Sequence, residues 1–141
     1  MYSVSHMTDS VDAVSIARAL GDTTRARIVA LLSRRDLCVC ELTEVLGQSQ
    51  ANVSGHLRLL VSAGLAASYQ RSYWTHYALV RTLPADILGF LDLVVRQATA
   101  QHLGDLHTLE QLPADVCALK QQQRRRARER KQKPSGTTKA Q

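Results

Sequence analysis

Two cysteines, Cys38 and Cys40, are the residues of this 141-residue chain whose type and spacing most clearly indicate chemistry. Thiolates are soft ligands that suit thiophilic metals. The pair directly precedes a short amphipathic segment that ends at Gly47, and a second amphipathic segment begins at Ser49. Two helices joined by so short a turn are typical of a DNA-binding helix-turn-helix. Metal ligands at its start suggest a switch in which metal binding opposes DNA binding.

The segment from 49 to about 63 has the pattern of a DNA-recognition helix. Its apolar residues recur at helical spacing and are expected to face the core: Val53, Leu57 and Leu60. Another face carries a polar residue at every fourth position: Gln50, Ser54 and Arg58. Such amide, hydroxyl and guanidinium groups bind base edges and phosphates. Ser49 is the expected N-terminal cap, and the helix start with Ser49 and Gln50 could take a phosphate.

Residues 65–71 and 74–80 have strand composition around a tight turn, which predicts a β-hairpin. From this hairpin Arg71, Tyr73 and His76 could contact the DNA backbone or minor groove, whereas Trp74 is expected to pack. For His56 two readings remain open, a DNA contact or packing at the domain edge.

The elements that must position these residues follow in a simple order. Helices are predicted over 11–20, capped by Ser10, and over 23–32, capped by Asp22. The helix-turn-helix and hairpin come next, then a helix over 84–102 and a helical segment from 106 that breaks at Pro113. The order predicts a mainly α fold with a small β-hairpin, a winged helix-turn-helix. Apolar stripes on the terminal helices predict a homodimer, which would place two recognition helices one DNA turn apart.

Composition and charge divide the chain. Hydrophobic residues make up 45%, enough for a core, and no run is long enough to span a membrane. No signal peptide is visible, so we expect a cytoplasmic protein, and three cysteines do not make a disulfide framework. Nine of the 18 lysines and arginines lie in 120–141. This basic tail could attract phosphates or could simply be solvated.

The expected organisation has four parts. Residues 1–8 form a disordered N-terminus, and 9–103 form the winged-helix domain for DNA binding and dimerisation. Residues 104–122 form a C-terminal helical segment with Cys117, and 123–141 form a basic disordered tail.

Four segments together resemble the arsenic-repressor (ArsR/SmtB) family of winged-helix metalloregulators. Residues 20–29 (LGDTTRARIV) resemble its opening motif, 37–42 (LCVCEL) its thiolate motif, 49–57 (SQANVSGHL) its recognition helix and 71–79 its wing. The resemblance covers roughly residues 10–100. It implies a homodimeric transcriptional repressor that leaves its operator DNA when a toxic metal or metalloid binds. It also implies that Gln50, Ser54, His56 and Arg58 contact DNA.

This chain departs from the family pattern at three positions. Thr23 stands where the family usually has Pro, Ser72 where the wing usually has Gly, and Thr43 where arsenic sensors often carry a third Cys. Trivalent arsenic and antimony take three sulfur ligands. Cys117 is the only other cysteine, so it is the expected third ligand, from the same or the other subunit. The alternative for Cys117 is a buried structural thiol.

Other effectors and classes stay open. Cadmium, lead or zinc could bind the thiols, although zinc normally takes four ligands. Asp105 and His107 resemble half of a zinc-sensing motif, but Ala118 stands where its second His is needed. The thiols could instead sense oxidants, or the chain could be a metal-independent architectural protein. Nothing in the pattern indicates an enzyme: we expect no catalytic residues, no bound cofactor and no small-molecule substrate.

The spacing of Cys38 and Cys40 also makes a geometric prediction. Residues i and i+2 of a regular helix point about 200° apart, so both thiols can face one ion only if the start of the helix is extended or distorted.

Overall fold

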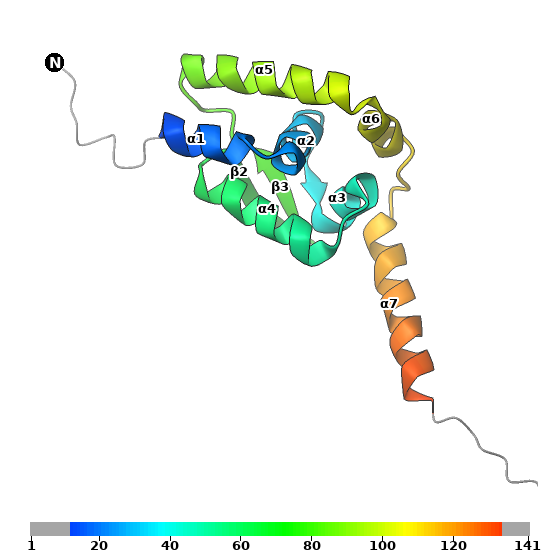
Figure 1. The fold of residues 1–141 in the computed structure, drawn as a ribbon. Coiled ribbons are helices and arrows are strands. Elements are labelled where there is room, and N and C mark those ends of the chain that lie inside the picture. The colour runs from blue at the N-terminus through cyan, green and yellow to red at the C-terminus, as the bar shows by residue number, and fades with distance from the viewer. Residues whose placement is uncertain (1–11, 134–141) are drawn as a thin grey trace, which may run out of the picture.

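The computed structural model describes residues 12–133 (Figure 1). Its elements, in chain order, are α1 (Ala13–Leu20), α2 (Thr23–Leu32), β1 (Leu37–Cys38), α3 (Val39–Leu46), α4 (Gln50–Ser62), β2 (Ala66–Arg71), β3 (Trp74–Leu79), α5 (Ala85–Gln101), α6 (Leu103–Glu110) and α7 (Val116–Gln132). The mainly helical fold with a small β-hairpin is as predicted. Within the described residues, no helix is long and apolar enough to cross a membrane.

Among the described helices, α1, α2 and α4 begin at side-chain caps. The Asp22 carboxylate accepts a hydrogen bond from the Arg25 amide at 3.1 Å and begins α2, as predicted. The prediction for α1 was wrong by two residues. Asp12, and not Ser10, caps this helix by accepting hydrogen bonds from the amides of Val14 and Ser15. Aspartate and serine are equally good caps, so the sequence alone could not choose between them. Ser10 itself lies outside the described residues.

The hairpin is joined by a third strand that the sequence did not reveal. β2 and β3 pair as predicted, and β1 pairs antiparallel with the other edge of β3, which gives the order β1-β3-β2. A strand of two residues has no periodicity to detect. The pairing sets Cys38 opposite His76, so it fixes the thiol-bearing end of β1 to the wing.

The core lies between α2, the α3–α4 pair, the hairpin and α5. Val53, Leu57 and Leu60 of α4 are fully buried, which confirms the predicted inner face of this helix. Helix α5 packs along α2 on the side away from α4 (Figure 1). In α5, Ile87 and Leu91 are buried against this core, whereas Leu88 is exposed.

The C-terminal helix is longer than expected. We predicted a disordered tail from 123, but α7 continues through Gln132. Residues 116–132 contain no Gly or Pro, and Gln, Arg, Lys, Ala and Glu all favour helix. The first proline after this segment is Pro134. The predicted disorder of 1–8 and of the chain end from 134 lies outside the described residues.

Ser72 at the hairpin turn has a left-handed backbone, with φ of 58°. This conformation costs a residue with a Cβ about 1 kcal/mol, and glycine avoids that cost. Replacing Ser72 with Gly is therefore expected to raise the free energy of unfolding by about 0.5 kcal/mol, as measured by urea denaturation. Ser72→Ala keeps the Cβ and should bring no gain. Equal stability of Ser72→Gly and wild type would contradict a strained turn.

Candidate nucleic-acid interface and thiol site

Helix α4 presents the predicted polar face to solvent. Ser49 caps it, because its hydroxyl oxygen accepts a hydrogen bond from the Asn52 amide at 3.2 Å. Gln50 and Arg58 are exposed and Ser54 is half-buried, one turn apart on the side opposite the buried residues. The structure therefore brings three of the predicted DNA-contacting residues onto one accessible face. That they contact DNA stays a prediction.

His56 lies apart from that face. Its Nδ1 is 3.2 Å from Nη1 of Arg25 and 3.8 Å from a carboxylate oxygen of Asp22, at the junction of α1 and α2. Burial disfavours the charged form of Asp22, but the Arg25 amide and the neighbouring Arg25 and His56 outweigh it, so the pKa of Asp22 is lowered. This placement favours the packing role for His56 over the DNA contact.

The three predicted contact residues of the wing lie in two different places. Arg71 and Tyr73 lie at the turn, where Tyr73 is 93% exposed. His76 lies further along β3, stacked on Tyr69 with ring centroids 5.6 Å apart. Tyr69 in turn donates a hydrogen bond to Asp36 at 2.6 Å, and this raises the pKa of Tyr69. The tip of the wing is therefore open to a partner, while His76 belongs to its base.

Cys38 has an extended backbone at the start of α3. It ends β1 and precedes α3 with φ −87° and ψ 166°, and it is only 3% exposed. Its backbone N–H donates to a Glu41 carboxylate oxygen at 3.1 Å, and the other oxygen of Glu41 accepts from Arg35 at 2.8 Å. These contacts fix the start of α3 independently of the thiol.

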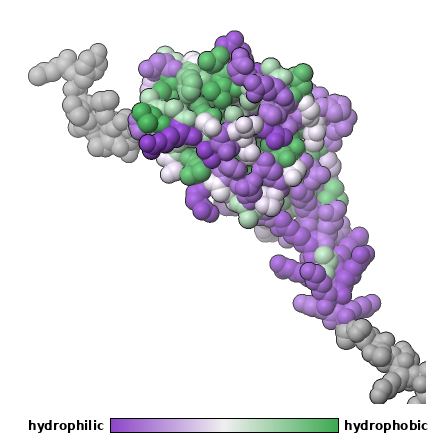
Figure 2. Space-filling view, in the orientation of Figure 1, coloured by the Kyte–Doolittle hydropathy of each residue, from purple (hydrophilic) through white to green (hydrophobic). Residues whose placement is uncertain are grey.

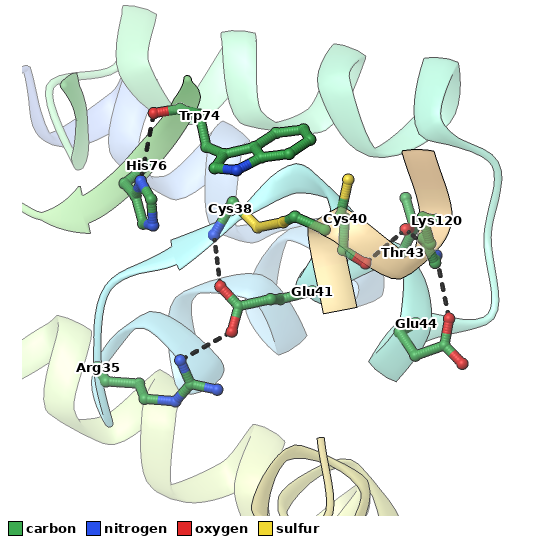
Figure 3. The surroundings of a disulfide bond; sticks show 10 residues. Arg35, Cys38, Cys40, Glu41, Thr43, Glu44, Trp74, His76 and Lys120 are labelled. Atoms are coloured by element: carbon green, nitrogen blue, oxygen red, sulfur yellow. Dashed lines mark hydrogen bonds and ion pairs between the residues drawn. A yellow bond between two sulfur atoms is a disulfide. The ribbon is translucent and has the colours of Figure 1, made fainter. Parts of the chain in front are cut away.

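Cys117 comes to this site from α7 of the same chain. It forms a disulfide with Cys38, 79 residues away in the sequence, and is 9% exposed. Val116, Leu112 and Trp74 pack around the two sulfurs. Figure 3 shows the Trp74 indole beside the bond. The packing role expected for Trp74 is confirmed, but the strand pairing that brings it here was not predicted.

Cys40 is a half-buried free thiol next to this pair. In Figure 3 its sulfur points away from the bond between Cys38 and Cys117, so the three sulfurs do not converge. Among residues 12–133, no group of three or more His, Cys, Asp or Glu side chains is arranged to hold a metal ion as it stands. A shared ion would require Cys40 to turn inward and the disulfide to be reduced.

Two basic residues of α7 extend its contact with the helix-turn-helix. Lys120 Nζ donates to the Thr43 hydroxyl at 2.7 Å and pairs with Glu44 at 3.0 Å, both on α3. Further along α7, Arg124 donates a hydrogen bond to the side-chain oxygen of Gln50 at the start of α4. Neither residue was expected at this interface from the sequence. The available signal was their spacing from Cys117, three and seven residues on, which places all three on one helix face.

Asp105 has a structural role in this chain. Both of its oxygens accept hydrogen bonds from Arg27, at 2.8 Å each, and this pairing raises the pKa of Arg27. The pair joins α6 to α2 and is mostly shielded from solvent. Asp105 is therefore a structural ion-pair partner of Arg27.

Residues 22–68 match the model of bacterial regulatory proteins of the arsR family. The chain is 36% identical over 91 residues to the arsenic resistance transcriptional regulator ArsR1 of Pseudomonas putida. The matched stretch covers 64% of this chain and 71% of that relative. It is 42% identical over 80 residues to the arsenical resistance operon repressor of Escherichia coli, with 56% of this chain and 68% of the relative covered. This chain belongs to the ArsR family.

The fold agrees with that family assignment. The structure of HlyU from Vibrio cholerae superposes with a TM-score of 0.54 at 27% identity, over 64% of this chain and 95% of HlyU. The predicted ArsR membership and the predicted winged helix-turn-helix are both confirmed. As an ArsR-family protein, the chain is a transcriptional regulator, with α3 and α4 as its helix-turn-helix and β2–β3 as its wing.

Proposed function

We propose that this protein is a homodimeric repressor that binds operator DNA through α4 and the wing and leaves it when a thiophilic ion, trivalent arsenic or antimony, binds Cys38, Cys40 and Cys117. The observation that carries the proposal is the position of Cys117. From 79 residues away it reaches Cys38, at the first residue before the helix-turn-helix. A ligand at this point acts directly on the element that positions the recognition helix.

The donor set suits a thiophilic ion. Two sulfurs are adjacent, and the third thiol lies two residues from Cys38 at the same helix start. The Cα atoms of Cys38 and Cys117 are 7.8 Å apart, more than the roughly 4.4–6.8 Å usual for a disulfide. With the bond reduced, this separation favours two thiolates that share an ion. Their apolar surroundings would keep water from competing.

The outward direction of the Cys40 side chain suggests how ion binding would weaken DNA binding. Its sulfur must turn toward the pair to complete three-sulfur coordination, and it lies in the first turn of α3. Drawing it inward would distort that turn and shift α3 against α4, the two helices that pack as the helix-turn-helix. The DNA-competent arrangement then loses population. By thermodynamic linkage, operator DNA should weaken metalloid binding by the same factor.

Dimerisation explains a surface that one copy leaves uncovered. Several large apolar side chains of α1 and α5 are exposed: Val14, Leu88, Phe90 and Leu93. Figure 2 shows hydrophobic residues gathered over this part of the molecule, whereas α7 is hydrophilic along most of its length. Because α5 lies on the far side of α2 from α4, pairing through α5 would leave both recognition helices free to bind adjacent half-sites (Figure 1).

A thiol-redox repressor is the second candidate, and the Cys38–Cys117 disulfide is the observation that favours it. Two thiols and hydrogen peroxide would yield the disulfide and two water molecules, with the peroxide oxygens reduced. Cadmium, lead and zinc are further candidate effectors, because the donors are soft sulfurs. In both alternatives the DNA-binding face is the same and only the effector differs.

Fluorescence anisotropy on a duplex from the protein's own promoter tests the proposal. With thiols reduced, the wild type should bind this DNA more tightly than a random duplex. Arsenite or antimonite at stoichiometric concentration should release it, and peroxide should not. Release by peroxide or cadmium, with no response to either metalloid, would assign the effector to another class. Binding no tighter than to the random duplex would refute the repressor itself.

A further inference from the structure

Helix α7 carries a basic stripe on the same face as its cysteine. Successive residues of a helix turn by about 100°, so residues spaced by three, four and seven share a side. One side of α7 therefore carries Cys117, Lys120, Arg124, Arg128 and Lys131. We refer to the last three of these, Arg124, Arg128 and Lys131, as the basic stripe.

This side of α7 is the one that faces the helix-turn-helix. The Cys117 bond to Cys38 and the Lys120 contacts with Thr43 and Glu44 dock the first turns on α3. The Arg124 contact with Gln50 then brings the beginning of the basic stripe to the first residue of the recognition helix. Beyond that point α7 extends past the folded domain (Figure 1). Its side chains there are exposed. The stripe is thus continuous with the polar face of α4.

The positive charge of the protein is concentrated on this helix. Residues 116–132 contain seven lysines and arginines and a single acid, Glu129. Residues 1–115 contain nine lysines and arginines against 11 acids, so they carry no excess positive charge. A 17-residue helix is about 25 Å long. Along that length a DNA duplex presents roughly 15 phosphate charges.

We propose that the basic stripe is a second DNA-binding surface, which contacts the phosphate backbone beside the half-site that α4 reads. The inference rests on the DNA binding of the proposed function and adds to it. Duplex DNA is the occupant that the surface fits, because the stripe begins at the recognition helix and its charge is opposite to that of the backbone. The same helix carries Cys117, so a rearrangement of that residue around a bound ion would also displace the stripe.

The test compares two triple variants that remove equal charge from different faces of α7. R124Q/R128Q/K131Q neutralises the stripe, and R125Q/R126Q/R130Q neutralises the other faces. Glutamine keeps the helix propensity, and circular dichroism verifies the fold. Anisotropy titrations at several salt concentrations use the promoter duplex and a random duplex. The stripe variant should lower the slope of log K against log salt by about 2 to 3 on both duplexes, and the control variant by less than about 1.

Three results would overturn the inference. Equal loss by both variants would mean that net charge alone matters, and no loss by the stripe variant would mean that α7 lies away from DNA. Tighter binding by the stripe variant would mean that α7 shields Gln50. The random duplex separates this test from the repressor proposal. If the wild type shows no preference for its promoter, the proposed function fails, while the difference in slopes on random DNA still decides the role of the stripe.

Discussion

Replacing Cys117 with Ser is expected to raise the arsenite concentration needed for DNA release by at least about 100-fold. Groups that merely support a metal ligand typically change affinity by 10- to 100-fold, so loss of a ligand should exceed that range. Serine is nearly isosteric, so the packing around Val116 and Trp74 should survive. Anisotropy of the promoter complex during arsenite titration measures the shift. DNA affinity without arsenite should change little.

A second substitution tests whether a third thiol on α3 can replace Cys117. Thr43 lies three residues after Cys40, on the same side of α3, and is 8% exposed. The double variant Cys117→Ser/Thr43→Cys moves the third thiol onto α3 and should recover most of the arsenite response. Thr43→Ser in the Cys117→Ser background keeps the hydroxyl that accepts from Lys120 and should recover nothing. A normal arsenite response in Cys117→Ser alone would show that Cys117 is structural.

Removing both ends of the polar face of α4 should weaken promoter binding by roughly 30-fold or more. A well-placed base contact contributes about 1–3 kcal/mol, so the double variant Gln50→Ala/Arg58→Ala should lose at least about 2 kcal/mol. Both side chains are exposed, so stability should change little. The comparison of promoter and random duplexes by anisotropy separates lost base reading from lost phosphate attraction.

Two variants at other positions of the same helix serve as controls. Ser62→Ala, at the exposed C-terminal end of α4, should bind promoter DNA like the wild type. His56→Gln should also bind within a few-fold of the wild type, because His56 faces Asp22 and Arg25. A loss in His56→Gln as large as that of the double variant would restore the DNA contact that its family resemblance implies.

Local signals in the sequence were enough to predict most of the winged helix. Caps at Asp22 and Ser49, the left-handed Gly47 and the apolar spacing of α4 each depend on a few neighbouring residues. The failures share a different cause. The strand β1 exists only because β3 lies beside it, and the position of His56 depends on Arg25, 31 residues away. Neither contact leaves a periodic pattern in the chain.

The candidate site also combines features that neighbouring residues determine with contacts between distant parts of the chain. Residue type alone led to the proposal of a three-thiol site, which stays a prediction. The spacing of Cys38 and Cys40 required an extended or distorted start of α3 only if both thiols bind one ion, and Cys38 is extended. The approach of Cys117 to Cys38 was expected by elimination, but the docking of α7 that produces it was not. In that docking, the side chains of Lys120 and Arg124 donate hydrogen bonds to side chains of α3 and α4. The basic composition of this segment was interpreted as a tail, although it is also a composition that favours a helix.

One titration tests the central claim most directly: arsenite is added to the reduced protein bound to its promoter duplex, and two signals are followed together. Ultraviolet absorbance of arsenic–sulfur bonds reports filling of the thiol site, and anisotropy reports release of DNA. We expect the two curves to coincide and to end at one arsenic per subunit. A site that fills while the DNA stays bound, or DNA that leaves before the site fills, would contradict a repressor controlled through Cys38, Cys40 and Cys117.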